Sequence, residues 1–588
     1  MAFKKILFIF IILISSCVDC LKVRPFHVDV EKRQRLTLSW DYDPDNVYFE
    51  VRAKVSPRAW LAVGFSDYGE YSNGDFCVFW TDSWGRRHFT DVYSDAMGAQ
   101  LHVDQQQDCE LTSVNQTASE TVIQFSRKRS TCDERDYQLE EGTTHTLFVV
   151  GPGPLSGVEG QSLDGKNLYK NMVRLSLFPP HSGLEEPDVT QQRHVKTMEV
   201  LSEKVKVPAR ETTYWCVIRK LPDLEEKNHI IQYEAAIQEG NEDLVHHIEV
   251  FHCLAPAGVR LYKWEGDCDA DGAPEQINHC KRVIGAWAMG SPPLTYPEEA
   301  GYPLGGKDFS PYIRIEMHYN NPAVTAGRVD SSGIRFYYTT QLRRYDAGCL
   351  ELGLEYSPKM AIPPRMAKFE LSGHCTAGCT SVGFPPRGIM VFASQLHTHL
   401  TGARVWTRHF RNGIELPELD RDNHYSTMYQ EIRKLKRRVN ILPGDELLTT
   451  CEFRTLDRKN ATLGGYAISD EMCVNYIHYY PRTNLEVCKS SIDTDSLMTY
   501  FEAMHTTDLD ETAPDKSVID NYHSIRWTPI TAAILRSLYQ ESPLSMQCNM
   551  SSGARFPGNW NNNPQVLITK PLPPKRDPCM LQGDDPEQ

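Results

Sequence analysis

A chain of 588 residues is too long for one compact core, which predicts several domains. Hydrophobic residues make up 40% and charged residues 24%, a composition that excludes a disordered or collagen-like chain. The formal net charge of −15 argues against a nucleic-acid-binding protein, because phosphate contacts need clustered cations.

The N-terminus has the pattern of a secretory signal peptide. Lys4 and Lys5 precede the apolar run 6–14, and small residues follow it. The run is too short to span a bilayer, which takes about 20 residues, and no later segment approaches that length. We expect residues 1–20 to be a signal peptide, with an uncleaved anchor as the alternative. The mature protein is then expected to have no transmembrane segment and to be secreted or held in the lumen of the secretory pathway.

Cysteine usage and glycosylation sequons agree with that compartment. Of 17 cysteines, Cys17 and Cys20 lie beside the expected cleavage site. An odd number remains, so at least one is a free thiol or bonds to another chain. Asn115, Asn460 and Asn549 each begin an Asn-X-Ser/Thr sequon and are the expected glycosylation sites.

Strand patterns dominate the chain from residue 34 onwards. Residues 34–150 alternate or are β-rich between turn signals, which predicts an antiparallel sandwich. Gly, Pro and polar residues dominate 151–208, which we interpret as a linker or wrapping segment. Strand patterns resume in two stretches, 209–325 and 326–505. The C-terminal region 506–588 has one expected helix, near residues 531–540, and a loop-like tail.

Histidines in the strand-like runs are candidate metal ligands. His397 and His399 alternate in one run, so both imidazoles would lie on one face and could share a metal ion. His246 and His247 are adjacent, and neighbouring strand residues face opposite ways. A shared metal there requires a bulge or an unusual ring geometry. His318, alone in its strand, is by itself more typical of a structural residue.

Six segments carry a specific resemblance when taken together. Over residues 214–481 the chain contains, in order, YWCVIRKLP, GNEDLVHHIEVF, EMHYNNP, ASQLHTHLTG, DNHYS and DEMCVNYIHYYP. This set resembles the copper type II, ascorbate-dependent monooxygenases, and WLAVGFSD and WTDSWG resemble the DOMON module of one branch of that family. The resemblance implies an all-β chain: an N-terminal DOMON β-sandwich, then two antiparallel, jelly-roll-like β-sandwich copper domains and a short C-terminal region.

The resemblance implies two copper ions per chain, one on each of the last two β domains. The implied ligands are His246, His247 and His318 for one copper, and His397, His399 and Met472 for the other. Imidazole suits copper in both oxidation states, and a thioether favours Cu(I). Zinc, the rival for a three-histidine site, has no redox chemistry. The implied reaction inserts one oxygen atom of O₂ into a C–H bond of a small-molecule substrate, with ascorbate as the electron donor.

Substrate choice is less well defined by these motifs. Tyr214 and His397 match the family's active-site residues, although Tyr214 could equally pack beside Trp215. The peptide-amidating branch has an Arg where this chain has Gln395, and a neutral amide cannot replace an Arg clamp on a carboxylate. We therefore expect a small aromatic amine as substrate rather than a peptide. Glu351 is a candidate partner for the amine, with an ordinary core-edge carboxylate as the alternative.

The resemblance also implies a disulfide framework. The implied pairs are Cys216–Cys268, Cys253–Cys280, Cys375–Cys488, Cys379–Cys548, Cys451–Cys473 and Cys132–Cys579. Cys77, Cys109 and Cys349 are left over, and the first two are candidates to pair because they lie in one β domain. Residues 505–518 lack the cysteines that link chains in some family members. We therefore expect no disulfide-linked dimer, and non-covalent association stays open.

A second function from another class competes with the enzyme. The chain could be a secreted copper-binding protein, or a DOMON protein that binds a ligand, without turnover. Asp67 and Asp91 are candidate cation ligands in the first β domain, with solvated loop carboxylates as the simpler interpretation. The presence of every implied copper ligand favours the enzyme.

Overall fold

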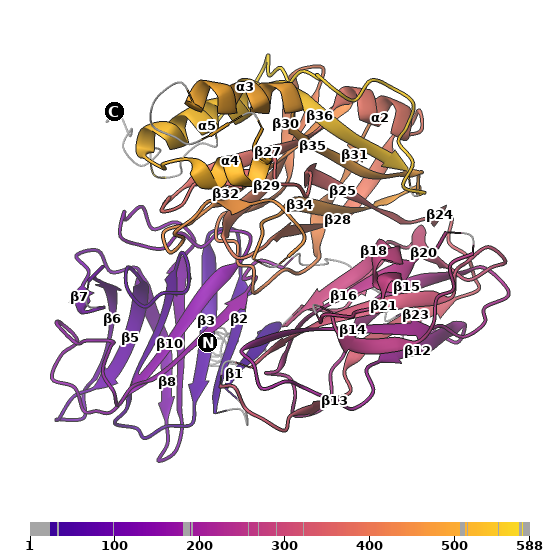
Figure 1. Cartoon of the computed structure of the whole chain (residues 1–588). Helices are drawn as coiled ribbons and strands as arrows, with labels where there is room; N and C mark the ends of the chain where they lie inside the picture. Colours follow the sequence, from indigo (N-terminus) through magenta and orange to yellow (C-terminus); the bar gives the residue numbers. More distant parts are fainter. Residues whose placement is uncertain are drawn as a thin grey trace, which may run out of the picture. The chain divides into compact units, whose positions relative to one another are not determined.

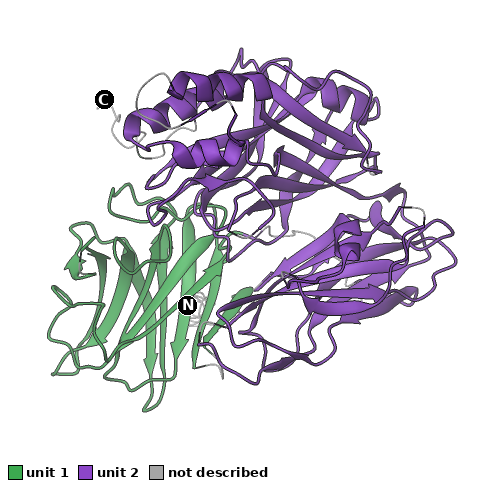
Figure 2. Ribbon diagram, viewed as in Figure 1, with its two compact units in different colours: residues 1–178, 575–588 green, residues 179–574 purple. Residues whose placement is uncertain are grey.

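The computed structural model describes residues 24–579 except 32–34, 98, 180–188, 190, 191, 257, 269, 290, 322, 468, 506–511, 514, 551 and 575–578. The expected signal peptide, residues 1–20, lies outside the described residues. The chain forms two compact units, residues 1–178 with 575–588, and residues 179–574 (Figure 2). Among the described residues, no helix is long and apolar enough to cross a membrane.

The first unit is a sandwich of two antiparallel sheets (Figure 1). One sheet has the order β1 (Phe26–Glu31), β2 (Leu36–Tyr42), β3 (Asn46–Ala53), β9 (Thr121–Lys128) and β8 (Cys109–Gln116). The other has the order β11 (Tyr169–Leu175), β10 (Thr144–Gly151), β4 (Trp60–Ser66), β5 (Asp75–Thr81), β6 (Arg87–Ser94) and β7 (Leu101–Val103). Alternating residues of β3, such as Val47, Phe49 and Val51, are fully buried in the core between the sheets.

The expected linker, residues 151–208, is not a linker throughout. Leu155, Val158 and Leu163 cover the outer face of the second sheet, which agrees with a wrapping segment. However, β11 is the edge strand of that sheet, and β12 (Val195–Leu201) belongs to the second unit. Most of β11 is only partly buried, so its sequence lacks the strong apolar alternation that marks a strand.

The N-terminal half of the second unit is another sandwich. One sheet has the order β12, β23 (Gly333–Thr339), β15 (Asn228–Ala236), β20 (Ala300–Leu304) and β24 (Tyr345–Asp346), with β19 (Leu294–Thr295) beside β15. The facing sheet has the order β17 (Trp264–Asp267), β14 (Thr212–Lys220), β21 (Tyr312–Asn320), β16 (Val245–Cys253) and β18 (Cys280–Ala288). The remaining elements are the ribbon β13 (Val205–Lys206) with β22 (Val329–Asp330) and the 3₁₀ turn η4 (Glu275–His279).

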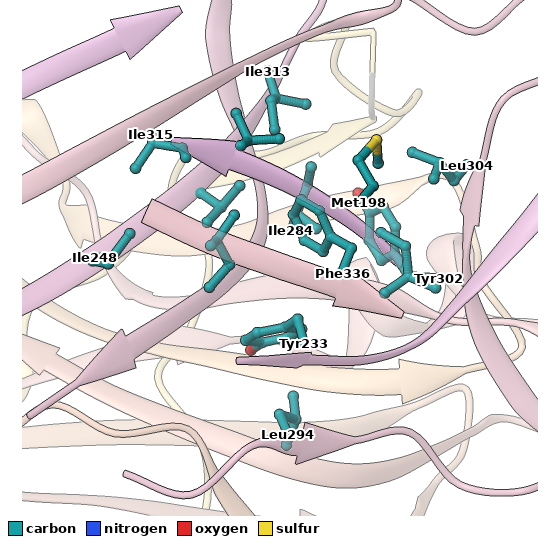
Figure 3. Packing of buried hydrophobic residues seen from close by; sticks show 14 of the residues in the cluster. Met198, Tyr233, Ile248, Ile284, Leu294, Tyr302, Leu304, Ile313, Ile315 and Phe336 are labelled. Atoms are coloured by element: carbon teal, nitrogen blue, oxygen red, sulfur yellow. The ribbon is translucent and has the colours of Figure 1, made fainter. Parts of the chain in front are cut away.

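The packing of this sandwich's core determines which side chains of the sheet with β16 and β21 face away from the core. Ile248 on β16 and Ile313 and Ile315 on β21 pack with Tyr233 and Phe336 of the other sheet (Figure 3). Since side chains alternate along a strand, the neighbours of these isoleucines lie on the opposite face. That outer face carries the histidines considered below.

The C-terminal half of the second unit is a third sandwich with added helices. One sheet has the order β31 (Arg433–Ile441), β28 (Ile389–Thr398), β34 (Cys473–Tyr480), β25 (Gly348–Leu354), β35 (Leu485–Ile492) and β36 (Leu544–Met550). The other has the order β27 (Phe369–Cys375), β32 (Asp445–Phe453), β29 (Gly402–Arg411) and β30 (Ile414–Asp422), and β26 (Ala361–Ile362) pairs with β33 (Thr462–Leu463). The helices are α2 (Ala377–Gly383), α3 (Thr494–His505), α4 (Val518–Ser524) and α5 (Pro529–Glu541).

The expected helix near residues 531–540 is present as α5, and its boundaries have clear causes. Thr528 caps it through a reciprocal capping box with Thr531, and Pro529 occupies the first turn, where its missing N–H costs nothing. The all-β prediction is confirmed, with α2, α3 and α4 as additional helices that the sequence analysis missed.

Candidate functional site

A β-bulge brings His246 and His247 together. On β21, Tyr319 pairs with Val245, and the preceding residue, His318, pairs with His247. His246 is therefore an extra residue in β16. Strand alternation alone would send adjacent side chains to opposite faces, and the bulge removes that obstacle. The bulge that His246 and His247 need in order to share a metal ion is therefore present.

Three imidazole nitrogens converge at this bulge. The Nδ1 of His247 lies 3.4 Å from the Nδ1 of His246 and 3.2 Å from the Nδ1 of His318. Ligands held by metal–imidazole bonds of about 2.0 Å in a tetrahedral arrangement would be about 3.3 Å apart. The two distances match that spacing, and the ligand atoms of all three histidines lie within 4.8 Å of one another, so the set could hold one metal ion.

Burial keeps the imidazoles of His247 and His318 neutral, the form that binds metal. It lowers the pKa of His318 to about 4 and that of His247 well below its usual range. Tyr214, opposite His318 on β14, stacks its ring on that imidazole with centroids 4.9 Å apart. The structure thus brings Tyr214 into contact with a candidate ligand rather than leaving it beside Trp215 alone.

The second candidate set lies at one end of the paired strands β28 and β34. His397 pairs with Val474 and Thr398 with Cys473, so the antiparallel register brings His399 opposite Met472. His399 and Met472 are both buried. The register therefore explains why residues more than 70 positions apart can serve one site.

Hydrogen bonds orient both imidazoles of this set. His397 Nδ1 donates to Oε1 of Gln430 at 2.6 Å, and His399 Nδ1 donates to the backbone carbonyl of Asp470 at 3.0 Å. Each bond fixes the tautomer and leaves Nε2 with its lone pair, which is how metal-binding histidines are usually supported. Burial lowers the pKa of His397 to about 3, so this ring is also neutral. Two Nε2 atoms and a thioether suit copper, especially Cu(I).

The carboxylate of Glu471 links the residues around this set. It accepts hydrogen bonds from the backbone N–H groups of His399, Thr401 and Met472, and from the Thr401 hydroxyl at 2.6 Å. The disulfide Cys451–Cys473 holds the residue after Met472. Sequence reasoning missed both Gln430 and Glu471. The position of Glu471 beside Met472 was a usable signal, whereas nothing in the spacing points to Gln430.

A row of side chains continues from His397 across β28, β34 and β25. Gln395 on β28, Tyr476 on β34 and Glu351 on β25 stand side by side in the register, and the Tyr476 ring lies 6.0 Å from that of His397. Glu351 forms an ion pair with the buried Lys489. Glu351, the candidate partner for the substrate's amine, is therefore already paired with a lysine.

A second carboxylate lies beside the three histidines. Glu249 is two residues after His247 and pairs with Glu316 across β16 and β21, on the same face as the imidazoles. Burial and the neighbouring charge of Glu316 raise the pKa of Glu249 to about 8. Its side chain is nevertheless half-buried, so it is recessed but open to water. A cation placed within about 4–6 Å would favour its charged form.

The two ligand sets lie within electrostatic reach of each other. Charge on His397 contributes to the lowered pKa of His247, and Glu249 contributes to the raised pKa of Tyr476. Ion pairs join the two halves of the second unit, including Arg282–Glu486 at 2.8 Å. The outer face of β16 and β21 and the row around Tyr476 thus belong to one functional region.

Seven disulfides are present among the described residues. They are Cys77–Cys109, Cys132–Cys579, Cys216–Cys268, Cys253–Cys280, Cys375–Cys488, Cys379–Cys548 and Cys451–Cys473. The last six have the pairing that the family resemblance implies. Cys349 is the free cysteine within the described part of the chain. Of the sequon asparagines, Asn115 and Asn460 are exposed and Asn549 is half-buried.

The candidate cation ligands of the first unit are not brought together. Asp91 is fully buried near Asp75 and Asp136, whereas Asp67 is exposed. Arg127 forms ion pairs with both Asp75 and Asp136. A buried arginine already supplies positive charge to this group of carboxylates.

Comparisons with known proteins cover almost the whole chain. Residues 32–151 match the DOMON domain, 198–326 match the N-terminal domain of copper type II ascorbate-dependent monooxygenases, and 345–501 match the C-terminal domain. The three histidines around the bulge fall in the second matched region, and the set around His397 falls in the third.

Full-length relatives are similar along most of their length. The chain is 43% identical to dopamine β-hydroxylase of Homo sapiens, covering 96% of this chain and 90% of that protein. It is 36% identical to tyramine β-hydroxylase of Caenorhabditis briggsae, covering 89% and 87%. It is 32% identical to DBH-like monooxygenase protein 1 of Mus musculus, covering 90% and 87%.

Proposed function

The chain belongs to the copper type II ascorbate-dependent monooxygenase family, and we propose that it hydroxylates a C–H bond of a small aromatic amine. As a family member it is a copper monooxygenase that uses O₂, ascorbate and two copper ions. The observation that carries the proposal is the convergence of three histidines at the bulge of β16, supported by a second group in which the strand register brings His399 opposite Met472.

We assign the copper ligands to the two sets described above. His246, His247 and His318 would hold one ion, and His397, His399 and Met472 the other. Copper bound there supplies reversible one-electron transfer at the first set and reaction with O₂ at the second, where the soft thioether favours Cu(I). The separation of the two sets on different β-sandwiches supports this division of labour.

The protein's own residues position these ligands. Gln430 and the Asp470 carbonyl hold the imidazoles of the second set, and Glu471 ties its two segments together. Tyr214 would act as an active-site residue through its stacking on His318. These contacts preorganise the donors, so little reorganisation is needed when the metal changes oxidation state.

The side chains near His397 support an amine rather than a peptide substrate. Gln395, where the peptide-amidating branch has an arginine, is buried and donates to the Gln430 carbonyl at 2.9 Å. It cannot form the bidentate clamp that a peptide carboxylate needs. Relatives named for dopamine and tyramine hydroxylation support the same substrate class.

We further propose that the protein works in the secretory lumen or outside the cell. The seven disulfides support an oxidising compartment, and the exposed sequons at Asn115 and Asn460 are accessible to glycosylation. With Cys349 half-buried, we expect no disulfide-linked dimer.

Ascorbate-driven oxygen uptake tests the proposed function. Copper-loaded protein should consume O₂ in the presence of tyramine and form a hydroxylated product in equal amount. The competing function, copper binding without turnover, predicts retained copper and no product. The same measurement with copper-free protein is the control, because both functions predict no turnover there.

A further inference from the structure

Three tyrosines form an unbroken line from the second ligand set to the surface of the protein. The Tyr476 ring on β34 lies 6.0 Å from the ring of His397. The hydroxyl oxygens of Tyr476 and Tyr356 are 3.2 Å apart, a hydrogen bond in which either can donate. The Tyr356 ring packs edge-to-face against the Tyr466 ring, with centroids 5.2 Å apart. Every link in the line is thus a direct contact between side chains.

The far end of the line is open to water and has a positive charge beside it. Tyr476 and Tyr356 are half-buried, whereas Tyr466, in the loop between β33 and β34, is 70% exposed. Lys281 of β18 lies over the Tyr466 ring, 5.9 Å from its centre. Ascorbate is an anion at neutral pH, so a lysine at this place favours its approach. The reductant of the reaction can therefore reach the last tyrosine of the line.

The surroundings of Tyr356 do not oppose the loss of an electron. Lys489 stands 3.4 Å from the centre of the Tyr356 ring, and a lone cation there would hold the electrons of the ring more tightly. Glu351 forms an ion pair with Lys489, however, and so cancels that charge. Oε2 of Glu351 also lies 3.4 Å from the Tyr356 hydroxyl. The middle of the line is therefore electrically neutral, although it contains a buried lysine.

Reaction with O₂ exposes the second ligand set to damage whenever no substrate is present. An oxidising equivalent that finds no C–H bond attacks a nearby oxidisable group, and this set includes the Met472 thioether. Oxidation converts methionine to its sulfoxide, a polar group that no longer offers a soft sulfur ligand. A phenol gives up one electron and one proton more readily than an imidazole or a thioether does. Tyr476, in contact with His397, is therefore placed to be oxidised before the ligands.

We propose that Tyr476, Tyr356 and Tyr466 form an electron-transfer chain that protects the second ligand set when O₂ reacts there without substrate. The inference rests on the proposed function and adds a role that hydroxylation itself does not need. In the first step, Tyr476 gives one electron and one proton to the oxidising equivalent, so its O–H bond breaks and a neutral phenoxyl radical remains. One electron and one proton then cross the hydrogen bond from Tyr356, which restores the O–H bond of Tyr476 and leaves the radical on Tyr356.

The last two steps bring the oxidising equivalent to the solvent. Tyr466 gives an electron to Tyr356 through the ring contact and releases its proton to water, while Tyr356 takes up a proton from water. Ascorbate then supplies one electron and one proton to Tyr466 and becomes the ascorbyl radical. Each oxidising equivalent thus consumes one electron of ascorbate, and no tyrosine is used up.

Turnover without substrate tests the proposal. Copper-loaded protein receives ascorbate and O₂ but no amine, with catalase present to remove peroxide from solution. Tyr466→Phe keeps the ring on the surface and removes the phenol, and Tyr356→Phe removes the hydroxyl in the middle of the line. After equal O₂ uptake, peptide mass spectrometry should find several-fold more sulfoxide at Met472 in both variants than in the wild type. Tyr262→Phe is the matched control: this tyrosine is 48% exposed but lies outside the line, so the sulfoxide at Met472 should stay at the wild-type level.

A radical trap locates the chain by a readout that a structural role of these tyrosines would not change. With limiting ascorbate and a nitroso spin trap, the wild-type protein should carry the trap on Tyr466. Tyr356→Phe should lose this adduct although Tyr466 itself is unchanged, because the oxidising equivalent no longer reaches it. The initial rate of tyramine hydroxylation should be equal in the wild type and Tyr466→Phe, since the chain is idle when substrate is bound.

Two results would overturn the proposal. One is a wild-type level of Met472 sulfoxide in both Tyr466→Phe and Tyr356→Phe. The other is an equal amount of trap on Tyr466 in the wild type and Tyr356→Phe, which would mean that oxidants in solution attack the exposed ring. If Tyr356→Phe does not bind copper, Met472 oxidation in Tyr466→Phe decides alone. A wild-type protein that consumes no O₂ with ascorbate and tyramine would contradict the proposed function instead, so the two failures are distinguishable.

Discussion

His397 Nδ1 donates a hydrogen bond to the side-chain oxygen of Gln430 over 2.6 Å. Gln430 in turn donates to the backbone carbonyl of Thr427 at 2.7 Å, so its amide orientation is fixed by a second bond. A candidate copper ligand is therefore held in one tautomer by a residue that no motif singles out.

Replacing Gln430 with Leu should weaken copper binding at the second set alone. Loss of an outer hydrogen bond to a metal-binding histidine typically costs about 10- to 100-fold in metal affinity. Competitive copper titration should show one weakened site and one unchanged site. Gln565→Leu is the control, because Gln565 bonds only to backbone carbonyls of Tyr539 and Ser542. Equal copper affinity of the second set in Gln430→Leu and Gln565→Leu would contradict this role for Gln430.

Copper stoichiometry should follow the two ligand sets. We expect two copper ions per wild-type chain, and His247→Ala should remove one while the other remains, because the sets lie on separate sandwiches. Metal analysis after copper loading and dialysis measures this directly. One copper in the wild-type protein, zinc at both sites, or loss of both ions in the variant would disagree with the assignment.

The secreted protein should migrate as a monomer on a non-reducing gel. The cysteines of the seven disulfides are already paired within the chain, and Cys349 is only partly accessible. Mass spectrometry of peptides under non-reducing conditions should recover the pairs, including Cys132–Cys579. A reducible dimer band that disappears in Cys349→Ser would show that this cysteine links two chains instead.

Stability should depend on pH through Asp346. Lys227 and His229 donate to its carboxylate, and these bonds hold the pKa of Asp346 at about 2, below its usual value. Because the folded-state pKa is the lower one, the stabilisation is complete above about pH 5 and disappears as the pH falls towards 2. At pH 7, Asp346→Asn should cost about 1–2 kcal/mol, a figure reduced for solvent screening because the side chain is 33% exposed.

Urea unfolding at pH 7 and pH 3 measures this effect. The difference between Asp346→Asn and the wild type should be smaller at pH 3. Asp223→Asn is the control: its side chain is 79% exposed, it pairs with Lys220 on the surface, and it should have little effect at either pH. A constant difference at both pH values would rule out the carboxylate's ionisation as the cause.

The all-β architecture could be predicted from sequence because most strands have one apolar face. β3 alternates perfectly between buried and half-buried residues. β11 and α4 escaped notice for different reasons, since most of β11 is only partly buried and α4 has only seven residues. The pattern of α3 was detectable: Leu497, Tyr500, Phe501 and Met504 are buried at helical spacing.

The candidate ligands could be identified only because several motifs occur together in a known order. Adjacent His246 and His247 gave no geometric reason to share a metal, and the bulge that allows it depends on pairing with β21. The contact between His397 and Gln430 depends on tertiary structure in the same way. Likewise, the ion pair of Glu351 with Lys489, 138 positions along the chain, could not be foreseen from local sequence.

Met472→Ile tests the central claim, that the set around His397 is the oxygen-activating site. The substitution removes sulfur and roughly conserves volume, so it should cost less than about 1.5 kcal/mol of stability. Met546→Ile, at a buried methionine of β36, is the matched control and should leave activity unchanged.

In a single-turnover experiment, ascorbate should still reduce the copper of the three-histidine set in Met472→Ile, as followed by loss of the Cu(II) signal. Hydroxylated tyramine should fall to background, because the second site lacks the soft ligand that favours Cu(I). Product formation near the wild-type rate in this variant would show that Met472 is core packing and would contradict the assignment of the second copper site.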